Sequence, residues 1–184
     1  MNLPEIETSR LKLRPYREAD IPDLVRLAGA REVAATTLRI AHPYTEQHAK
    51  EFLRMAEDDD KAWFAITLSD SGQFCGGVGL RIEPEHSRAE VGYWVGVPFW
   101  GNGYATEAAQ AAVRYGFEDL RLRRISAAVS KGNAASEKIL QKLGMRHEGC
   151  LREHQCKWGK FMDVELYGIL RAEWESQPSR NLSQ

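Results

Sequence analysis

The repeat of apolar and polar residues is clearest in the middle of the chain, over residues 90–117. From residue 90 to residue 97 the pattern alternates at every second position, which predicts a strand that Pro98 ends. One face carries Glu90, Gly92, Trp94 and Gly96, and the other carries Val91, Tyr93, Val95 and Val97. Apolar residues then recur every three or four positions over residues 105–117, which predicts an amphipathic helix packed on a sheet.

Similar patterns predict the elements on either side of this central unit. Before it we expect a strand at residues 6–14, helices at 18–28 and 45–57, and a hairpin of strands at 63–68 and 74–82. After it we expect a strand at 123–129, a helix at 133–143, and a final hairpin of strands at 148–156 and 162–170. Residues 31–44 have weak periodicity and predict a loop or a broken helix.

The order of these elements predicts an α/β fold, in which one mixed sheet has helices on both faces. A strand, a helix and a strand in succession imply a crossover that makes the two strands parallel, whereas hairpins make their strands antiparallel. With 184 residues, of which 43% are hydrophobic, we expect a single domain over residues 1–175. Residues 176–184 are polar and predict a disordered tail.

A glycine-rich turn joins the central strand to its helix. Gly101 and Gly103 permit backbone conformations that a side chain would block, and the first turn of a helix has N–H groups without partners. Such a turn suits phosphate oxygens, although the same residues also fit a tight connection that binds nothing. Two other phosphate-binding loops are disfavoured. Thr106 stands at the third glycine position of a dinucleotide fingerprint, and the chain contains no G-x-x-x-x-G-K-[ST] string.

The strand, turn and helix resemble motif A of the GNAT acetyltransferase superfamily, whose signature is R/Q-x-x-G-x-G/A. Trp100, Gly103 and Ala105 fill its places, with Trp100 departing from the usual Arg or Gln. The longer string is similar to the RimJ/RimL-type branch, which acetylates ribosomal-protein N-termini, and the likeness covers roughly residues 7–172. It implies about seven mostly antiparallel strands, about four helices and a splayed parallel pair of strands. We expect Gly92 and Gly96 to supply a bulge that opens this pair.

The same resemblance implies acetyl-CoA as the cosubstrate. Main-chain groups of Trp94, Val95 and Val97 would hold its pantetheine arm. Its diphosphate would lie against the turn formed by Gly101, Asn102, Gly103, Tyr104, Ala105 and Thr106. Its 3′-phosphate would meet lysines, for which Lys131, Lys138 and Lys142 are candidates unless they are simply solvated.

Asn133 and Ser136 begin the next helix with an N-x-x-S sequence that resembles motif B of the family. By this likeness Asn133 would contact the pantetheine, and Ser136 would donate to the leaving sulfur. An ordinary helix cap explains the same residues without chemistry. Glu90 is our candidate for the base, acting directly or through water, because burial near Trp94 would favour a carboxyl that accepts protons near neutral pH. The alternative is an ion pair with Arg88.

The acceptor pocket is expected between the first two helices. Thr36, Thr37, Arg39 and Tyr44 would line it by resemblance, unless this connection is a solvated loop. Trp158 either borders the cleft or covers the core edge, and the acidic run at residues 58–60 is read as a solvated helix end rather than as a site for a cationic acceptor.

Composition narrows the partners and the location. A net charge of -1 and a pI near 6.5 give no general attraction to nucleic acid or to an anionic membrane. The chain has no signal pattern and no apolar run that would span a bilayer, so we expect a cytoplasmic protein. Three cysteines without C-x-x-C spacing and five histidines without H-E-x-x-H predict no metal site.

We therefore expect an acetyl-CoA-dependent N-acetyltransferase, a monomer or homodimer, that acts on a protein or peptide N-terminal amine. A free α-amine has a pKa of about 8 and a lysine of about 10.4, so the N-terminal acceptor demands less of a base. One alternative acceptor is a small amine such as a polyamine, an amino acid or an aminoglycoside. Another alternative is a non-catalytic regulatory module that binds coenzyme A.

Overall fold

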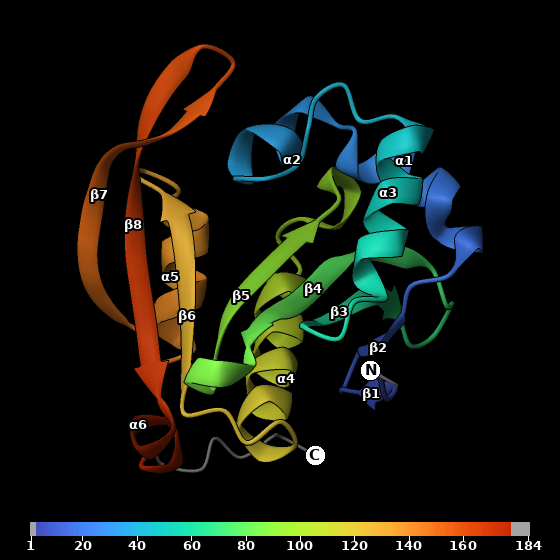
Figure 1. Ribbon diagram of the computed structural model, residues 1–184. Helices are drawn as coiled ribbons and strands as arrows, with labels where there is room; N and C mark the ends of the chain where they lie inside the picture. The colour runs from blue at the N-terminus through green and yellow to red at the C-terminus, as the bar shows by residue number, and fades with distance from the viewer. Residues whose placement is uncertain (1–2, 178–184) are drawn as a thin grey trace.

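The computed structural model describes residues 3–177, which form one sheet with helices on both faces (Figure 1). The sheet has eight strands in the order β1-β2-β3-β4-β5-β6-β8-β7. Their bounds are β1 Ile6–Glu7, β2 Leu11–Pro15, β3 Lys61–Leu68, β4 Phe74–Glu83, β5 Arg88–Val95, β6 Arg124–Ser130, β7 Arg146–Lys157 and β8 Lys160–Leu170. Neighbouring strands are antiparallel except β5 and β6, which are parallel.

Helices cover both faces of this sheet. The α-helices are α1 Ile21–Ala28, α2 Arg31–Thr36, α3 Glu46–Ala56, α4 Tyr104–Glu118, α5 Ala134–Lys142 and α6 Arg171–Glu175. Because side chains alternate along β3, Phe64 lies in the core cluster beneath α4 and α5, whereas Ala65 lies in the cluster beneath α1 and α3. Two apolar cores therefore sandwich the sheet.

The central helix α4 packs closely because its inner face is small. Ala108, Ala109 and Ala112 are fully buried against the sheet, and Phe117 closes the far end of the same stripe. The three-and-four spacing of the sequence thus predicts the buried face correctly. Gly103 caps the first turn with φ of +79°, a conformation that glycine adopts at little cost.

The parallel strands β5 and β6 separate halfway along their length (Figure 1). They pair only from Arg88 opposite Arg124 to Glu90 opposite Ser126. Beyond that point β5 continues along β4 in unbroken register to Val95, and β6 continues along β8 to Ser130. The predicted splay is confirmed. Each strand follows its outer neighbour, so the bulge expected at Gly92 and Gly96 is not present and is not needed.

Other differences from the sequence-based expectation lie at the ends of elements. The expected strand at residues 6–14 is two short strands joined by a turn, and β1 adds one strand to the expected sheet. Residues 31–36 form the helix α2, and α6 follows β8. Val97 lies outside β5, in the 3₁₀ turn Val97–Phe99.

Residues 178–184 of the expected tail lie outside the described part of the chain. Within residues 3–177, no helix combines the length and the apolar character that crossing a bilayer requires.

Candidate acetyl-transfer site

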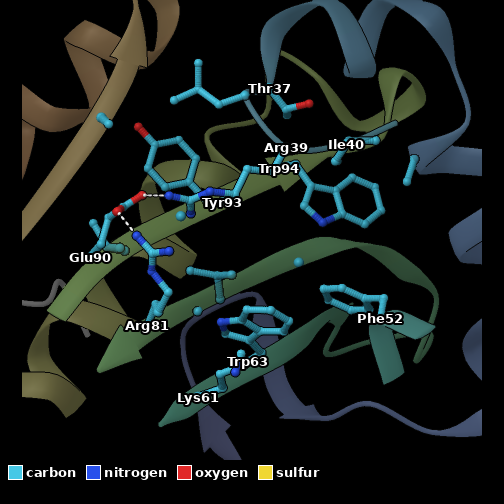
Figure 2. A pocket seen from close by; sticks show the side chains of 18 of the residues that line it. Thr37, Arg39, Ile40, Phe52, Lys61, Trp63, Arg81, Glu90, Tyr93 and Trp94 are labelled. Carbon is cyan, nitrogen blue, oxygen red and sulfur yellow. Dashed lines mark hydrogen bonds and ion pairs between the residues drawn. The ribbon is translucent and has the colours of Figure 1, made fainter. Parts of the chain in front are cut away.

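A cleft of about 520 Å³ opens where β5 and β6 separate. Its walls come from the connection after α2, from α3, from strands β3 to β6 and from the start of α5. Figure 2 shows its interior, where Tyr93 and Trp94 extend from β5 to different sides of the strand. The expected acceptor residues Thr36, Thr37, Arg39 and Tyr44 all line it.

At one end of β5, the turn before α4 presents free main-chain donors. The N–H groups of residues 101–106 have no acceptor within the described chain. Gly101 and Gly103 both have φ of +79°, and a Cβ on Gly101 would meet no atom within 4 Å beyond its chain neighbours. Converging amides, the positive end of a helix and open space beside them suit an anion such as a diphosphate.

Side chains hold this turn in place from below. The Trp100 indole donates to the Val95 carbonyl at 2.7 Å, and the Arg10 guanidinium donates to the Asn102 carbonyl at 2.9 Å. Arg10 also pairs with Glu107 in the first turn of α4 at 2.7 Å. Burial opposes ionisation of Glu107, but hydrogen bonds from Thr8, Arg10 and Ser9 outweigh it and lower the pKa of this carboxyl. Arg10 and Glu107 could not be identified from the sequence, because they are 97 residues apart in the chain and meet only in the fold.

The edge of β5 that faces the split offers main-chain groups of alternate residues. Gly96 donates to the Cys75 carbonyl at 2.9 Å, in register with the β4–β5 pairing. Alternation along an antiparallel pair then directs the N–H and C=O groups of Trp94 to β4, and those of Tyr93 and Val95 toward the split. The main-chain groups of Trp94, which were expected to contact the pantetheine, therefore pair with β4, whereas those of Tyr93 and Val95 face the split.

A pair of hydroxyl groups lies at the split. The Tyr93 and Ser136 oxygens are 2.8 Å apart, and Ser136 lies in the first turn of α5. Asn133 caps this helix by accepting from the Ser136 N–H, and its amide also donates to the Thr36 carbonyl at 3.0 Å. Burial raises the pKa of Tyr93 to about 12, so the phenol stays protonated at neutral pH. Tyr93 was missed from sequence because its strand position marked it only as a core residue.

Glu90 is the last residue of β5 that pairs with β6, at the point where these two strands begin to separate. One carboxylate oxygen lies 2.8 Å from Arg39, and the other lies 2.7 Å from Arg81 (Figure 2). Glu90 is therefore ion-paired, as the alternative interpretation held, but its partners are these two arginines and not Arg88. Arg88 instead pairs with Glu83 at 2.6 Å.

The far wall of the cleft is aromatic. The rings of Phe52 and Trp63 stack with centroids 5.0 Å apart, and Tyr16 meets the edge of Phe52 at the same distance. A Cβ on Gly77 would lie 2.0 Å from the Tyr16 hydroxyl and 2.7 Å from the Trp94 indole nitrogen. Because Gly77 has no side chain, the Tyr16 hydroxyl and the Trp94 indole nitrogen can both occupy this space.

Comparison with known proteins identifies the family. A model of the acetyltransferase (GNAT) domain matches residues 10–146.

This chain belongs to the GNAT acetyltransferase family.

Its relatives agree with that assignment. The uncharacterised N-acetyltransferase p20 of Bacillus licheniformis is 33% identical over 173 residues, which cover 91% of this chain and 96% of p20. The ribosomal-protein-serine acetyltransferase of Escherichia coli is 32% identical over 87 residues, which cover 47% of this chain and 49% of that protein. The spermidine N-acetyltransferase of Vibrio cholerae, solved with CoA and spermine, has a TM-score of 0.82 at 23% identity and covers 91% of this chain and 99% of its own.

These findings confirm the resemblance to the GNAT family and its RimJ/RimL-type branch. The protein is an N-acetyltransferase, and its acetyl donor is acetyl-CoA. The site fits this donor. The N–H groups of residues 101–106 follow β5 in the chain and have no acceptors within the described residues, and the Tyr93–Ser136 hydroxyl pair lies on the side of β5 where the strands separate.

In this acetyltransferase, the β7–β8 hairpin braces the acceptor side. The Lys157 ammonium donates to the carbonyls of Ala34 and Thr37, and the Gln155 amide donates to the Leu38 carbonyl. Burial lowers the pKa of Lys157. Of the two positions expected for Trp158, a place in the cleft lining is not what the structure shows. Its ring lies outside the cleft lining, against the Arg31 guanidinium at 5.4 Å.

Other expected charged residues have structural partners. Lys131, a candidate for the 3′-phosphate, pairs with Asp163 at 3.1 Å. In the acidic run at residues 58–60, Asp58 and Asp60 each lie 2.7 Å from Lys61. Within residues 3–177, side chains of metal-ligand type gather at the β4–β5 turn as Glu83, Glu85 and His86. Glu83 of this group is the partner of Arg88, away from the cleft lining.

Proposed function

We propose that this acetyltransferase modifies the α-amino group of a peptide or protein N-terminus. The donor supplies an activated acetyl thioester. The N–H groups of residues 101–106 would hold the donor's diphosphate, and the main chain of Tyr93 and Val95 would hold its pantetheine arm along the edge of β5. Trp100 and Arg10 keep this surface rigid through their bonds to main-chain carbonyls.

Ser136 and Tyr93 are proposed to serve the leaving sulfur. A thiol has a reference pKa of about 8.5, so its thiolate leaves readily and needs only modest help. The 2.8 Å contact between the two hydroxyls lets Tyr93 donate to Ser136 while Ser136 donates onward. Because the pKa of Tyr93 is raised to about 12, this donor does not titrate near neutral pH. Asn133 orients the pair by accepting from the Ser136 N–H.

The structure changes our proposal for Glu90. Each of its carboxylate oxygens is ion-paired with a guanidinium group, so Glu90 belongs to a salt-bridge cluster and is not an unpaired carboxylate beside the amine. We propose that Glu90 is a positioning residue that holds Arg39 and Arg81. An α-amine, with a pKa of about 8, is partly neutral at physiological pH and can lose its proton to water.

The charges of the cleft support a peptide rather than a polyamine. Of the charged residues that line it, Arg39 and Arg81 share Glu90, and Lys61 is paired with Asp58 and Asp60. A polyamine would require unpaired carboxylates, and the carboxylate nearest the split is paired twice. The double pairing of Glu90 is the observation that favours an N-terminal amine over the small-amine alternative.

Thiol release from acetyl-CoA tests the proposal. The acceptors are N-terminal peptides that begin with Ser, Ala or Met, their Nα-acetylated forms, spermidine and an aminoglycoside. We expect the free peptides to stimulate release and their blocked forms to be inactive. Faster turnover of spermidine than of every peptide would reject the proposed acceptor class while leaving the acetyltransferase assignment intact.

A further inference from the structure

Two arginines at the cleft share a single carboxylate. Arg39 reaches Glu90 from the loop between α2 and α3, and Arg81 reaches it from β4 (Figure 2). Elsewhere Arg14 pairs with Asp20, and Arg124 pairs with Glu148, each as one cation with one anion. The Arg39–Glu90–Arg81 cluster therefore carries one more positive charge than negative charge.

The exposed part of this cluster is cationic. The side chain of Arg39 is 61% exposed and that of Arg81 is 44% exposed, whereas that of Glu90 is 20% exposed. Each guanidinium has five N–H donors, and within residues 3–177 each of these two arginines has Glu90 as its hydrogen-bonding or ionic partner. Free donors thus remain on both guanidinium groups, while Glu90 fixes their positions from below.

The cluster lies in the same cleft as the proposed acetyl-transfer site. Arg39, Arg81 and Glu90 line the same cleft as the Tyr93–Ser136 hydroxyl pair, and Glu90 is three residues before Tyr93 on β5. The nearby basic residue Lys61 is already matched by two aspartates. An anion that enters the cleft would therefore find free donors on Arg39 and Arg81, in the same cleft as the hydroxyl pair at which the amine would be acetylated.

From this geometry, and resting on the proposed function, we infer that Arg39 and Arg81 form a carboxylate-binding site that selects acceptors with a carboxylate close to the primary amine. Two planar guanidinium groups can each bind a carboxylate through paired hydrogen bonds, which a single lysine cannot do. The carboxylate has two possible sources, an acidic side chain near a peptide N-terminus or the α-carboxylate of a free amino acid. The stacked Phe52 and Trp63 rings would contact the apolar part of either acceptor.

The test compares acceptors that differ only in this charge. Kinetics of acetylation are measured with Ser-Asp and Ser-Asn peptides of otherwise identical sequence, and with free serine and serinamide. We expect the Asp peptide to be favoured over the Asn peptide at least about tenfold in kcat/KM, mainly through a lower KM. A preference for serine over serinamide, without one between the peptides, would assign the site to the free amino acid.

Variants connect this preference to the two arginines. Arg39→Gln and Arg81→Gln should each reduce the preference for the Asp peptide to less than about threefold, with the larger loss on the acidic substrate. Arg88→Gln is the matched control, because Arg88 lies on β5, pairs with Glu83 and does not line the cleft. Retention of the preference in both cleft variants, or its loss in the control, would overturn the inference.

The outcomes separate this inference from the proposed function. Acetylation of peptides with equal rates for Asp and Asn would support the function and overturn the carboxylate site. Acetylation of serine but of no peptide, with serine still preferred over serinamide, would support the carboxylate site and overturn the proposed function. If no acceptor releases thiol, calorimetric binding of the Asp and Asn peptides to the protein with coenzyme A decides, and equal affinities count against the site.

Discussion

The coenzyme side and the acceptor side of this cleft are built from different materials. The proposed coenzyme side consists mainly of main-chain groups on β5 and in the turn before α4, whose positions are set by the strand and by the helix. The acceptor side consists of side chains from β3, β4 and α3 and from the loop after α2, which the β7–β8 hairpin holds through Lys157 and Gln155. Main-chain binding tolerates most substitutions, whereas side-chain binding changes with each one. On the proposed assignment, the backbone of the fold would bind the donor, and a few exchangeable side chains would select the acceptor.

The largest effect is expected where a side chain would block the main chain. Gly103→Val places a branched side chain at φ of +79° beside the free amides and should weaken coenzyme A binding at least about 100-fold. Gly72→Val is the matched control, because Gly72 also has a left-handed φ, of +70°, with open space around it, and lies in the β3–β4 turn. Calorimetric titration of both variants measures the effect. Equal affinity in the two would show that the turn does not bind the coenzyme.

The next effect concerns the place where the two sides meet. Ser136→Ala should lower kcat about tenfold with little change in coenzyme affinity, since it removes a donor from the leaving sulfur. Tyr93→Phe should lower kcat less, and the double variant should lose no more than Ser136→Ala alone, because Tyr93 acts through Ser136. Single-turnover kinetics measure all three. Fully additive losses would mean that the two hydroxyls act independently.

A smaller effect is expected on the acceptor side from Glu90→Gln. This variant keeps the shape but releases Arg39 and Arg81, so KM for peptide acceptors should change about threefold to tenfold. The pH profile of kcat should keep its shape, because Glu90 is proposed to position the arginines rather than to accept a proton. If kcat of the native enzyme rises with pH and kcat of Glu90→Gln does not, Glu90 acts as the base and the proposal is contradicted.

The smallest effect concerns the support beneath the coenzyme turn. Glu107→Gln should reduce the free energy of unfolding by about 2 kcal/mol at pH 7, because the charged form accepts from Arg10, Thr8 and Ser9. The folded-state pKa of Glu107 is below its ordinary value of 4.5. Its stabilisation is therefore fully present above pH 4.5 and is lost as pH falls through the folded pKa. Urea unfolding at pH 7 and at pH 3 measures this, and a difference that grows on acidification would contradict it.

The same contrast explains what the sequence could predict. The alternation over residues 90–97, the two glycines and the alanine stripe predicted β5, the turn before α4 and the buried face of α4, because these features depend on neighbours along the chain. The partners of Glu90 could not be predicted in the same way. Arg39 and Arg81 come from separate elements, and only the folded sheet brings them to one carboxylate.

Two smaller differences between the expectation and the structure have the same physical origin. The splay of β5 and β6 was expected to need a bulge, yet it arises because each strand remains with its outer neighbour. Trp94 was expected to bind the pantetheine through its main chain, but strand register, which depends on β4, directs those groups away from the split.

An amide-resolved NMR titration with coenzyme A tests most directly whether main-chain donors before α4 bind the acetyl carrier. We predict that the largest shifts fall on the N–H groups of residues 101–106, with smaller shifts for Tyr93 and Val95, and that removal of the diphosphate portion abolishes the first set. Saturable binding that leaves residues 101–106 unshifted, with the largest changes on the β7–β8 hairpin, would contradict this placement.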